Sequence, residues 1–422
     1  MNSDAIQLVN VGLLPIPSGH QPGSDSLLLS AGRIEWIGSR AECPDEHPAT
    51  VIDCKGRLAL PGLMDLHVHL VYRDVSDAYS IELERSIEEA TLDAAANADR
   101  LLSLGFTTVR DVGTRGNIAC VVRDAIDEGR LRGPQVRASQ QIISSWGTGD
   151  YHPTHIFQDQ LYSHSLSRLV NGPWEVRKAV RQQAKDGVDW IKIEASGTGF
   201  NPFCPAERTT LTFEEIAAAV DEAADKGLPV SCHAESSSSI LRAANAGVNT
   251  IEHAIQISED AIDSILSKDI AVCPTLGLYS AFAAMDTASG VPRQVIENHK
   301  RTHASHVQSL RRAVDAGVSI VAGSDSGILN FPQGGCLEEL CLYVELLGMS
   351  EEDALASCTS RPAEVLGFKD RGEVSVGLRA DLVVFESSPL EHIRALTDPR
   401  GPLLVIKAGE IAVDRTKEVN DA

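Results

Sequence analysis

Features typical of nucleic-acid-binding, membrane and secreted proteins are scarce in this 422-residue sequence. Aromatic residues make up only 5% of the chain, so no platform for stacking bases is indicated. The 37 basic residues are outnumbered by 59 acidic ones, and the net charge of −22 disfavours polyanionic partners such as nucleic acid or an anionic membrane. No apolar run approaches the roughly 20 residues that cross a bilayer, and the N-terminus lacks a secretory signal. We expect a soluble globular protein without nucleic-acid or membrane partners, and among such proteins an enzyme.

The nine cysteines contain no Cys-x-x-Cys pair and no four-cysteine zinc cluster; they are scattered from Cys43 to Cys358. A disulfide framework is unusual in a chain of this length, and isolated cysteines usually serve as small buried hydrophobic residues. A reducing, cytoplasmic location is therefore expected.

One pattern recurs between about residues 59 and 367: an amphipathic helix, a glycine, and a short strand that ends in a polar residue. In the clearest unit, Thr212 and Glu215 form a capping box, Gly227 ends the helix, residues 228–232 form a buried strand, and His233 follows. Four further strands follow a glycine in the same way: one ends at Asp111, one reaches Lys192, and two lead to His253 and Asp325.

Helices that alternate with strands imply parallel strands joined by right-handed crossovers. About eight such units in about 300 residues match the size of a (β/α)8 TIM barrel, which is the predicted fold class, α/β. The alternative is an open doubly wound sheet, but no G-x-G-x-x-G or Walker A loop follows a strand.

The two chain ends are rich in strands and turns and differ from the centre. We expect residues 1–58 and 368–422 to form one small β-sandwich domain beside the barrel of residues 59–367. Long loops in a compact domain are usually lids or binding loops, and three are predicted: 142–172, 196–211 and 326–336.

Two histidines stand at the end of the first predicted barrel strand. Because side chains alternate along a strand, Asp65, His67 and His69 share one face, while the apolar residues between them face the helices. His67 and His69 would point into the barrel, where both imidazoles can bind one cation. Taken alone, a His-x-His pair is a weak signal.

Lys192 lies between two isoleucines that suit the helix side, so its side chain is predicted to point inward. A desolvated lysine has a lowered pKa and can be a neutral amine. Such an amine can add carbon dioxide to form a carbamate, whose two oxygens can bridge two cations. The alternative is a lysine at the rim with its ammonium in water.

His233, His253 and Asp325 end three later strands, and each singly could be an ordinary buried polar residue. In a barrel, however, the carboxyl ends of all strands converge on one rim, where active sites lie. Six metal-capable residues at such ends predict a metal site.

Several of these motifs together resemble the amidohydrolase superfamily, over about residues 13–413. The matching segments, in order, are Leu60–His69, Gly105–Asp111, Trp190–Ile193, Cys232–Ala234, Ile251–His253, Gly323–Asp325 and Ala380–Val384. The sequence looks closest to the prolidase-like, imidazolonepropionase-related branch with a lysine on the fourth strand.

This resemblance implies a binuclear centre of two divalent ions, usually zinc, with cobalt or manganese as alternatives. His67, His69 and Asp325 would hold one metal, His233 and His253 the other, and N-carboxylated Lys192 would bridge them. Such a pair makes hydroxide available for attack on an amide carbonyl. Asp325 is the only carboxylate among the six, and we assign it the proton transfer from water to the leaving nitrogen.

Substrate contacts are expected from the loop after the third strand, where relatives often place a histidine. His152 is the candidate for an oxyanion or carboxylate contact, with Tyr151 or His155 as substitutes. Tyr72 and Arg110 are further candidates, although Arg110 could instead pair with a carboxylate.

Three carboxylates near the ligands have other expected roles. Asp65 is expected to support ligands, and Asp111 is expected to be structural. Glu235 could meet a cationic substrate group or lie exposed in a loop.

The resemblance predicts hydrolysis of an amide C–N bond in a dipeptide or N-acyl amino acid, including ochratoxin-type amides and Xaa-Pro or other Xaa-amino-acid carboxypeptidase substrates. A xenobiotic phenylurea, carbamate or thiocarbamate is the alternative. A mononuclear deaminase or cyclic-amide hydrolase, and a non-enzymatic assembly module, are further classes. Homo-oligomers from dimer to octamer are expected by analogy.

Overall fold

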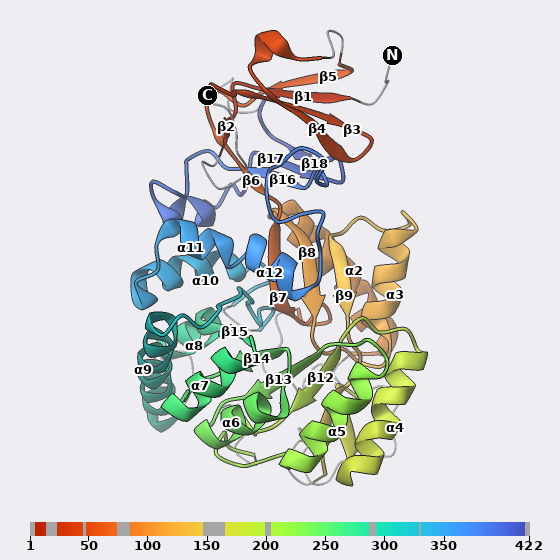
Figure 1. Ribbon diagram of the computed structural model, residues 1–422, viewed down its shortest axis with the longest axis vertical. Coiled ribbons are helices and arrows are strands. Elements are labelled where there is room, and N and C mark those ends of the chain that lie inside the picture. Colours follow the sequence, from red (N-terminus) through yellow and green to blue (C-terminus); the bar gives the residue numbers. More distant parts are fainter. Residues whose placement is uncertain are drawn as a thin grey trace. The chain divides into compact units, whose positions relative to one another are not determined.

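The computed structural model of the chain describes residues 5–13, 23–44, 48–73, 85–146, 165–198, 204–286, 293–328 and 331–417, apart from the side chains of 294 and 295. These residues divide into two compact units. The first contains Met1–Met64, Asp99–Thr108 and Ser350–Ala422, and the second contains Asp65–Ala98 and Val109–Met349. Figure 1 labels the helices and strands.

Two sheets form most of the first unit. One has the order β4-β3-β1-β5, with β1 (Ile6–Val9) parallel to β5 (Thr50–Asp53) and antiparallel to β3 (Ser26–Ser30), which pairs with β4 (Arg33–Gly38). The other has the order β18-β17-β16-β6-β2. Its strands are β2 (Gly12–Leu13), β6 (Leu58–Pro61), β16 (Leu382–Val384), β17 (Leu404–Lys407) and β18 (Glu410–Asp414).

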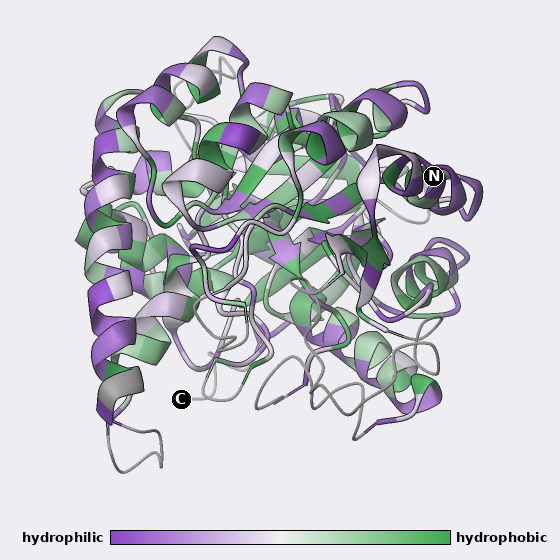
Figure 2. Cartoon of the chain, turned by 90° about the horizontal axis from the view of Figure 1, so that it is seen from below, coloured by the Kyte–Doolittle hydropathy of each residue, from purple (hydrophilic) through white to green (hydrophobic). Residues whose placement is uncertain are grey.

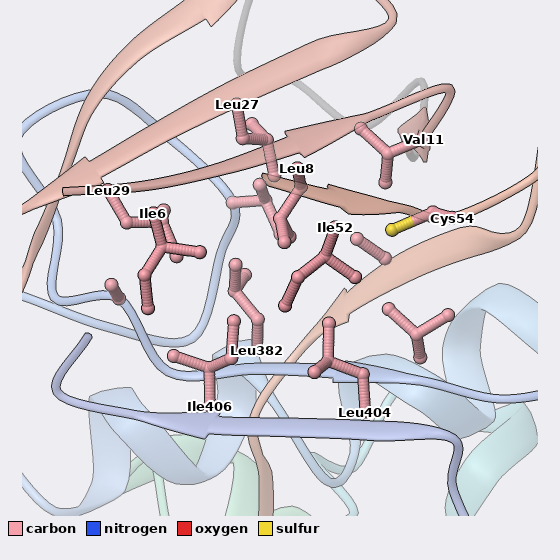
Figure 3. Packing of buried hydrophobic residues seen from close by; sticks show 14 of the residues in the cluster. Ile6, Leu8, Val11, Leu27, Leu29, Ile52, Cys54, Leu382, Leu404 and Ile406 are labelled. Atoms are coloured by element: carbon pink, nitrogen blue, oxygen red, sulfur yellow. The ribbon is translucent and has the colours of Figure 1, made fainter. Parts of the chain in front are cut away.

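Both sheets contribute side chains to one hydrophobic cluster (Figure 3). Leu8 and Leu27 of the first sheet and Leu382 and Leu404 of the second are completely buried in it. Strands 320 or more residues apart in the chain therefore share one core, because β6, from the N-terminal part, pairs with β16, from the C-terminal part.

The second unit is a mixed α/β structure with a six-stranded parallel sheet of order β11-β10-β12-β13-β14-β15. Its strands are β10 (Ile142–Ser145), β11 (Ser167–Val170), β12 (Ile191–Glu194), β13 (Val230–Ala234), β14 (Thr250–His253) and β15 (Ala271–Cys273). A three-stranded sheet has the order β7-β8-β9, with β7 (Leu63–Val68), β8 (Phe106–Asp111) and β9 (Gln135–Ala138).

Residues 320–326 connect these two sheets. On one side Ile320 pairs in parallel with Val272 of β15, and on the other Ser326 pairs in parallel with Val68 of β7. The carboxyl end of this segment therefore lies beside the carboxyl end of β7, which brings Asp325 close to the predicted histidines.

Helices alternate with the strands and lie outside them, as Figure 1 shows for α4 to α7. In Figure 2 hydrophilic residues line the outer sides of the peripheral helices. The capping box of Thr212 and Glu215 is present at the start of α5, which confirms the predicted helix start. The helix buries Ile216 and Ala219, whereas Phe213 is exposed. The α-helices are α2 (Ile87–Ser103), α3 (Ile118–Asp127), α4 (Gly172–Lys185), α5 (Phe213–Ala224), α6 (Ser237–Ala246), α7 (Glu259–Ser267), α8 (Leu276–Ala283), α9 (Arg293–Asp315), α10 (Cys336–Leu342), α11 (Glu351–Ala356) and α12 (Ser360–Val365). The other helical turns are η1 (Arg40–Glu42), η4 (Tyr343–Leu347) and η5 (Ile393–Thr397).

Two expectations about local structure need correction. The strand predicted at 228–232 begins at Val230 and includes His233, because its register with β12 continues past Cys232. The loop predicted over 142–172 begins and ends in strands, since β10 and β11 pair with each other.

The nine cysteines all lie within the described residues, form no disulfide and are buried except for the partly exposed Cys43. Among the described helices, none combines the length and the apolar character required to span a membrane.

Candidate metal centre

The six predicted metal ligands all belong to the second unit and stand at or near strand ends. They are His67 in β7, His69 directly after it, Lys192 in β12, His233 in β13, His253 at the end of β14, and Asp325 in the segment that pairs with β7. Adjacent parallel strands place their carboxyl ends at one edge, so the local sequence pattern becomes a spatial cluster.

Short distances join these side chains. Asp325 Oδ1 lies 3.5 Å from His69 Nε2 and 3.8 Å from His67 Nε2. The ring centres of His67 and His253 are 5.0 Å apart, and those of His233 and His253 are 4.5 Å apart. One ligand atom from each of His67, His253 and Asp325 fits within a span of 4.8 Å. This cluster could hold a metal ion.

Hydrogen bonds fix which nitrogen each histidine offers. His69 Nδ1 lies 2.7 Å from the carbonyl oxygen of Gly113, which can only accept, so Nδ1 donates and Nε2 is left with its lone pair. His67 Nδ1 lies 2.7 Å from Glu252 Oε2, which likewise frees Nε2. His233 differs, because its Nε2 contacts the carbonyl of Gly197 at 3.1 Å and leaves Nδ1 as the ligand atom.

Burial keeps these imidazoles neutral. Desolvation lowers the pKa of His69 to about 4 and that of His233 to about 3, and the charge of Lys192 acts in the same direction. The pKa values of His67 and His253 lie well below the ordinary value for the same main reason. Neutral imidazole is the form that binds metals, so the cluster is prepared for a cation at neutral pH.

Lys192 is the most unusual member of the cluster. Its side chain is 2% exposed, and Nζ has no hydrogen-bond partner among the described residues. Desolvation lowers its pKa, Arg110 lowers it further, and the carboxylates of Glu252 and Asp325 oppose the shift. Lysine is rarely buried without a partner, so this amine needs a chemical explanation.

Asp325 is a carboxylate in a setting that disfavours its charge. Burial raises its pKa to about 8, the charge of Lys192 opposes this shift, and the carboxylates of Asp65, Glu252 and Glu235 add to it. Its backbone has a φ of 51°, a left-handed conformation that few non-glycine residues adopt. A bound cation would stabilise the anion at this position.

A buried ion pair contacts His67 of the cluster through Glu252, a residue that the sequence analysis did not single out. Arg110 NH2 lies 2.8 Å from Glu252 Oε1, and neither side chain is exposed. The other guanidinium nitrogens of Arg110 donate to Leu66 O and Thr250 Oγ1. The predicted substrate contact of Arg110 is therefore corrected, because its three nitrogens are engaged within the protein and the alternative, pairing with a carboxylate, is what the structure favours.

The remaining described candidates lie around the ligands. Asp65 accepts hydrogen bonds from Ser324 Oγ (2.6 Å) and Ser324 N (3.0 Å), and Asp111 accepts one from Leu70 N, so both brace backbone. Tyr72 is buried with its ring 4.6 Å from that of His69.

Glu235 is 1% exposed and accepts a hydrogen bond from the hydroxyl of Tyr279 at 2.9 Å. The alternative that Glu235 is an exposed loop residue is wrong. Its carboxylate Oε1 lies 3.7 Å from Nε2 of His233, next to the cluster.

Tyr151, His152 and His155 lie outside the described residues. Sequence analysis also missed Thr275, whose Oγ1 lies 2.7 Å from His253 Nδ1. A threonine after a strand carries no distinctive pattern, so only the fold identifies it.

Comparisons with known proteins find a family match and relatives that cover most of the chain. The model of the amidohydrolase family matches residues 58–412. Ochratoxinase of Aspergillus niger is 27% identical over 423 residues, which cover 96% of this chain and 86% of that protein. Imidazolonepropionase of Paracoccus denitrificans (strain Pd 1222) is 28% identical over 407 residues, covering 88% and 89%. A prolidase complexed with N-methylphosphonate-L-proline superimposes with a TM-score of 0.84 at 28% identity, covering 96% of this chain and 99% of that one.

Proposed function

The chain belongs to the amidohydrolase family, and we propose that it uses two divalent metal ions to hydrolyse an amide C–N bond in a dipeptide or an N-acyl amino acid. The observation that carries this proposal is Lys192, a fully desolvated amine without a hydrogen-bond partner among the described residues, in the same unit as five other metal-capable side chains. A mononuclear deaminase would leave that amine without a role.

The donor set fits a pair of metal ions. His67, His69 and Asp325 would hold one ion through Nε2, Nε2 and a carboxylate oxygen, and His233 and His253 would hold the other. Mixed nitrogen and oxygen donors suit zinc, and they also accept cobalt or manganese. When bound, the ions supply Lewis-acid polarisation of the scissile carbonyl and lower the pKa of water.

Carboxylation of Lys192 would complete the set. The neutral amine adds to the carbon of carbon dioxide, a new N–C bond forms, and one proton leaves to solvent. The product is a carbamate anion whose two oxygens can each face one ion. The lowered pKa of Lys192 supports this step, because only the neutral amine has the required lone pair.

Asp325 would move the proton. Its Oδ1 faces His67 and His69, which leaves Oδ2 to accept a proton from the attacking water and to donate it to the departing amide nitrogen. Its raised pKa, about 8 without a cation, supports a carboxyl group that can carry a proton during turnover.

Two relatives support the choice of substrate class. Their names are ochratoxinase and prolidase, and both cover almost the whole of this chain. We infer that this chain, too, cleaves an amide that joins an acyl group to an amino acid, with Tyr72 and the loop containing Tyr151 and His152 as substrate contacts.

The test is a substrate panel with metal-loaded protein: Xaa-Pro and other dipeptides, N-acyl amino acids including ochratoxin A, phenylureas, carbamates and thiocarbamates, followed by chromatography. We expect release of a free amino acid and about two metal ions per chain by elemental analysis. Hydrolysis confined to phenylureas, carbamates or thiocarbamates would contradict the proposed class of dipeptides and N-acyl amino acids. One ion per chain would overturn the binuclear site.

A matched pair of variants tests the proton transfer. Asp325→Asn removes the carboxyl group, whereas Asp315→Asn changes an exposed residue at the end of α9. We expect a loss of at least 10²-fold in kcat for the first variant only, the lower range for general acid–base groups. Full activity of Asp325→Asn on every hydrolysed amide would contradict the assignment.

The architecture is proposed in the same terms. We infer that the strands within residues 59–367 close a (β/α)8 barrel, supported by the pairing of residues 320–326 with both neighbours. The two sheets that share one hydrophobic cluster support a β-sandwich from residues 1–58 and 368–422. We also propose a homo-oligomer, to be tested by light scattering, and a cytoplasmic location, to be tested by cell fractionation.

A further inference from the structure

The chain leaves β14 through an unusual turn. His253 and Ala254 have φ values of 67° and 53°, so two consecutive non-glycine residues are left-handed. This conformation is disfavoured for L-residues and persists only where the surroundings impose it. The first of the two residues carries an imidazole of the candidate metal centre, so the turn determines where that imidazole points.

One face of α9 holds the segment after β14. His306 Nε2 lies 2.7 Å from His253 O, Ser309 Oγ donates to Ile255 O at 2.6 Å, and Arg312 NH2 donates to Ile257 O at 3.1 Å. The three side chains are three residues apart on the helix, and the three carbonyls are two residues apart on the segment that follows β14. Of these contacts, only that of His306 reaches a predicted metal ligand.

The imidazole of His306 makes a single hydrogen bond among the described residues, to the carbonyl oxygen of His253. A carbonyl oxygen only accepts, so Nε2 carries the hydrogen and donates it to His253 O. The ring is completely buried, and Nδ1 has no hydrogen-bond partner among the described residues. Burying a polar nitrogen without a partner is unfavourable, so this imidazole is not explained by packing alone.

A second contact holds the imidazole ring of His253, the candidate ligand whose carbonyl His306 contacts. Thr275 Oγ1 lies 2.7 Å from His253 Nδ1 and directs Nε2 toward the cluster. The ring of Tyr279 lies between, with centres 6.0 Å from His253 and 5.1 Å from His306. His253 is therefore held at its carbonyl by α9 and at its ring by the end of β15.

We propose that His306 is a positioning residue for the second metal ion: its Nε2–H holds the carbonyl of His253 in the left-handed turn, and the turn presents the imidazole of His253 to the ion. This inference rests on the proposed function, because it takes His253 as a ligand. It assigns a role to a helix outside the strands that carry the ligands.

The test replaces the donor while keeping a side chain of similar size. The amide nitrogen of glutamine takes about the position of Nε2, whereas that of asparagine takes about the position of Nδ1. His306→Gln should therefore keep the hydrogen bond and His306→Asn should lose it. Ser309→Ala is the matched control, because it removes the neighbouring contact of α9 with Ile255 and leaves that with His253.

Metal affinity, measured by chelator competition, and the visible spectrum of the cobalt-substituted protein are the readouts. We expect His306→Asn to weaken the binding of one of the two ions by about 10–100-fold and to change the spectrum. His306→Gln and Ser309→Ala should have metal affinities and spectra close to those of the wild type. Equal affinities in His306→Asn and wild type would overturn the inference, as would a loss in Ser309→Ala or His306→Gln as large as in His306→Asn. A wild-type protein that binds no metal would overturn the proposed function itself.

Discussion

Substitution of Glu252 can distinguish two roles of one carboxylate, which are to orient a candidate ligand and to stabilise the fold. Its carboxylate accepts from Arg110 NH2 at 2.8 Å through Oε1 and from His67 Nδ1 at 2.7 Å through Oε2. Burial opposes its ionisation, but the Arg110 guanidinium and the His67 hydrogen bond hold the pKa of Glu252 well below its usual range. Glu252→Gln keeps the shape and removes the charge.

Two effects of different size should follow. Neither Arg110 nor Glu252 is exposed, and removing one partner of a buried pair typically costs about 3–5 kcal/mol. Loss of the carboxylate behind a metal-binding histidine typically weakens metal affinity by about 10–100-fold, or about 1.4–2.7 kcal/mol. The metal-free protein should therefore lose more stability than the site loses affinity.

The assay measures unfolding of the metal-free protein by urea and metal affinity by chelator competition. A lowered carboxyl pKa gives stability that is present above the pKa of the unfolded state and is lost only in acid. The differences between Glu252→Gln and wild type in unfolding free energy and in metal affinity should therefore stay constant from about pH 6 to 9.

Glu128→Gln is the matched control for this substitution. Glu128 lies 2.6 Å from Arg130, but both side chains are about 60% exposed, so a change within about 1 kcal/mol is expected. A Glu252→Gln protein with unchanged unfolding and unchanged affinity would refute the reasoning.

Three further substitutions test the surroundings of the site. Lys192→Ala should abolish the metal pair, with partial rescue by acetate or propionate, whereas exposed Lys185→Ala should not; elemental analysis with and without the acid decides this. Gly197→Ala would place a Cβ 2.1 Å from Cys204 O, so the Gly197 carbonyl that accepts from His233 must shift, and the affinity for one of the two ions should fall in chelator competition. Burial raises the pKa of Glu339 to about 8, so the wild type should lose stability relative to Glu339→Gln as the pH rises from about 4.5 to 8; urea unfolding at several pH values would show no such trend if the carboxyl were solvated.

The sequence singled out the candidate ligands because each one departs from the local alternation of polar and apolar residues. His67, Lys192 and Asp325 are polar residues at strand ends where the alternation leaves an inward position, and such breaks are typical of functional sites. The capping box at Thr212 fixed the start of a helix in the same local way. Both depend on neighbours in the chain, which is why sequence reasoning reaches them.

The residues that contact the candidate ligands could not be predicted, because their partners lie far away in the sequence. Glu252 pairs with Arg110 across 142 positions, and His306 bonds the His253 carbonyl across 53. A histidine on a long amphipathic helix and an arginine in a buried strand look ordinary until the fold brings their partners together. Arg110 illustrates the difficulty, since the same inward position suited a substrate contact and an ion pair equally well.

The unfavourable free-energy terms at the site, backbone strain and desolvated charge, arise at the candidate ligands and next to them. His253, Thr275 and Asp325, at three neighbouring strand ends, are all left-handed, at about 1–3 kcal/mol each. Lys192 is desolvated without a hydrogen-bond partner among the described residues, and Asp325 is a carboxyl whose charge is disfavoured. The hydrogen bonds that join His253 to Thr275 and to His306 hold this strained arrangement but do not offset the two disfavoured charges. The proposed cations would offset them, because they would stabilise the carboxylate of Asp325 and take up the lone pairs that the histidine tautomers leave open. The strain, the burial and the histidine tautomers thus all support the metal ions proposed above.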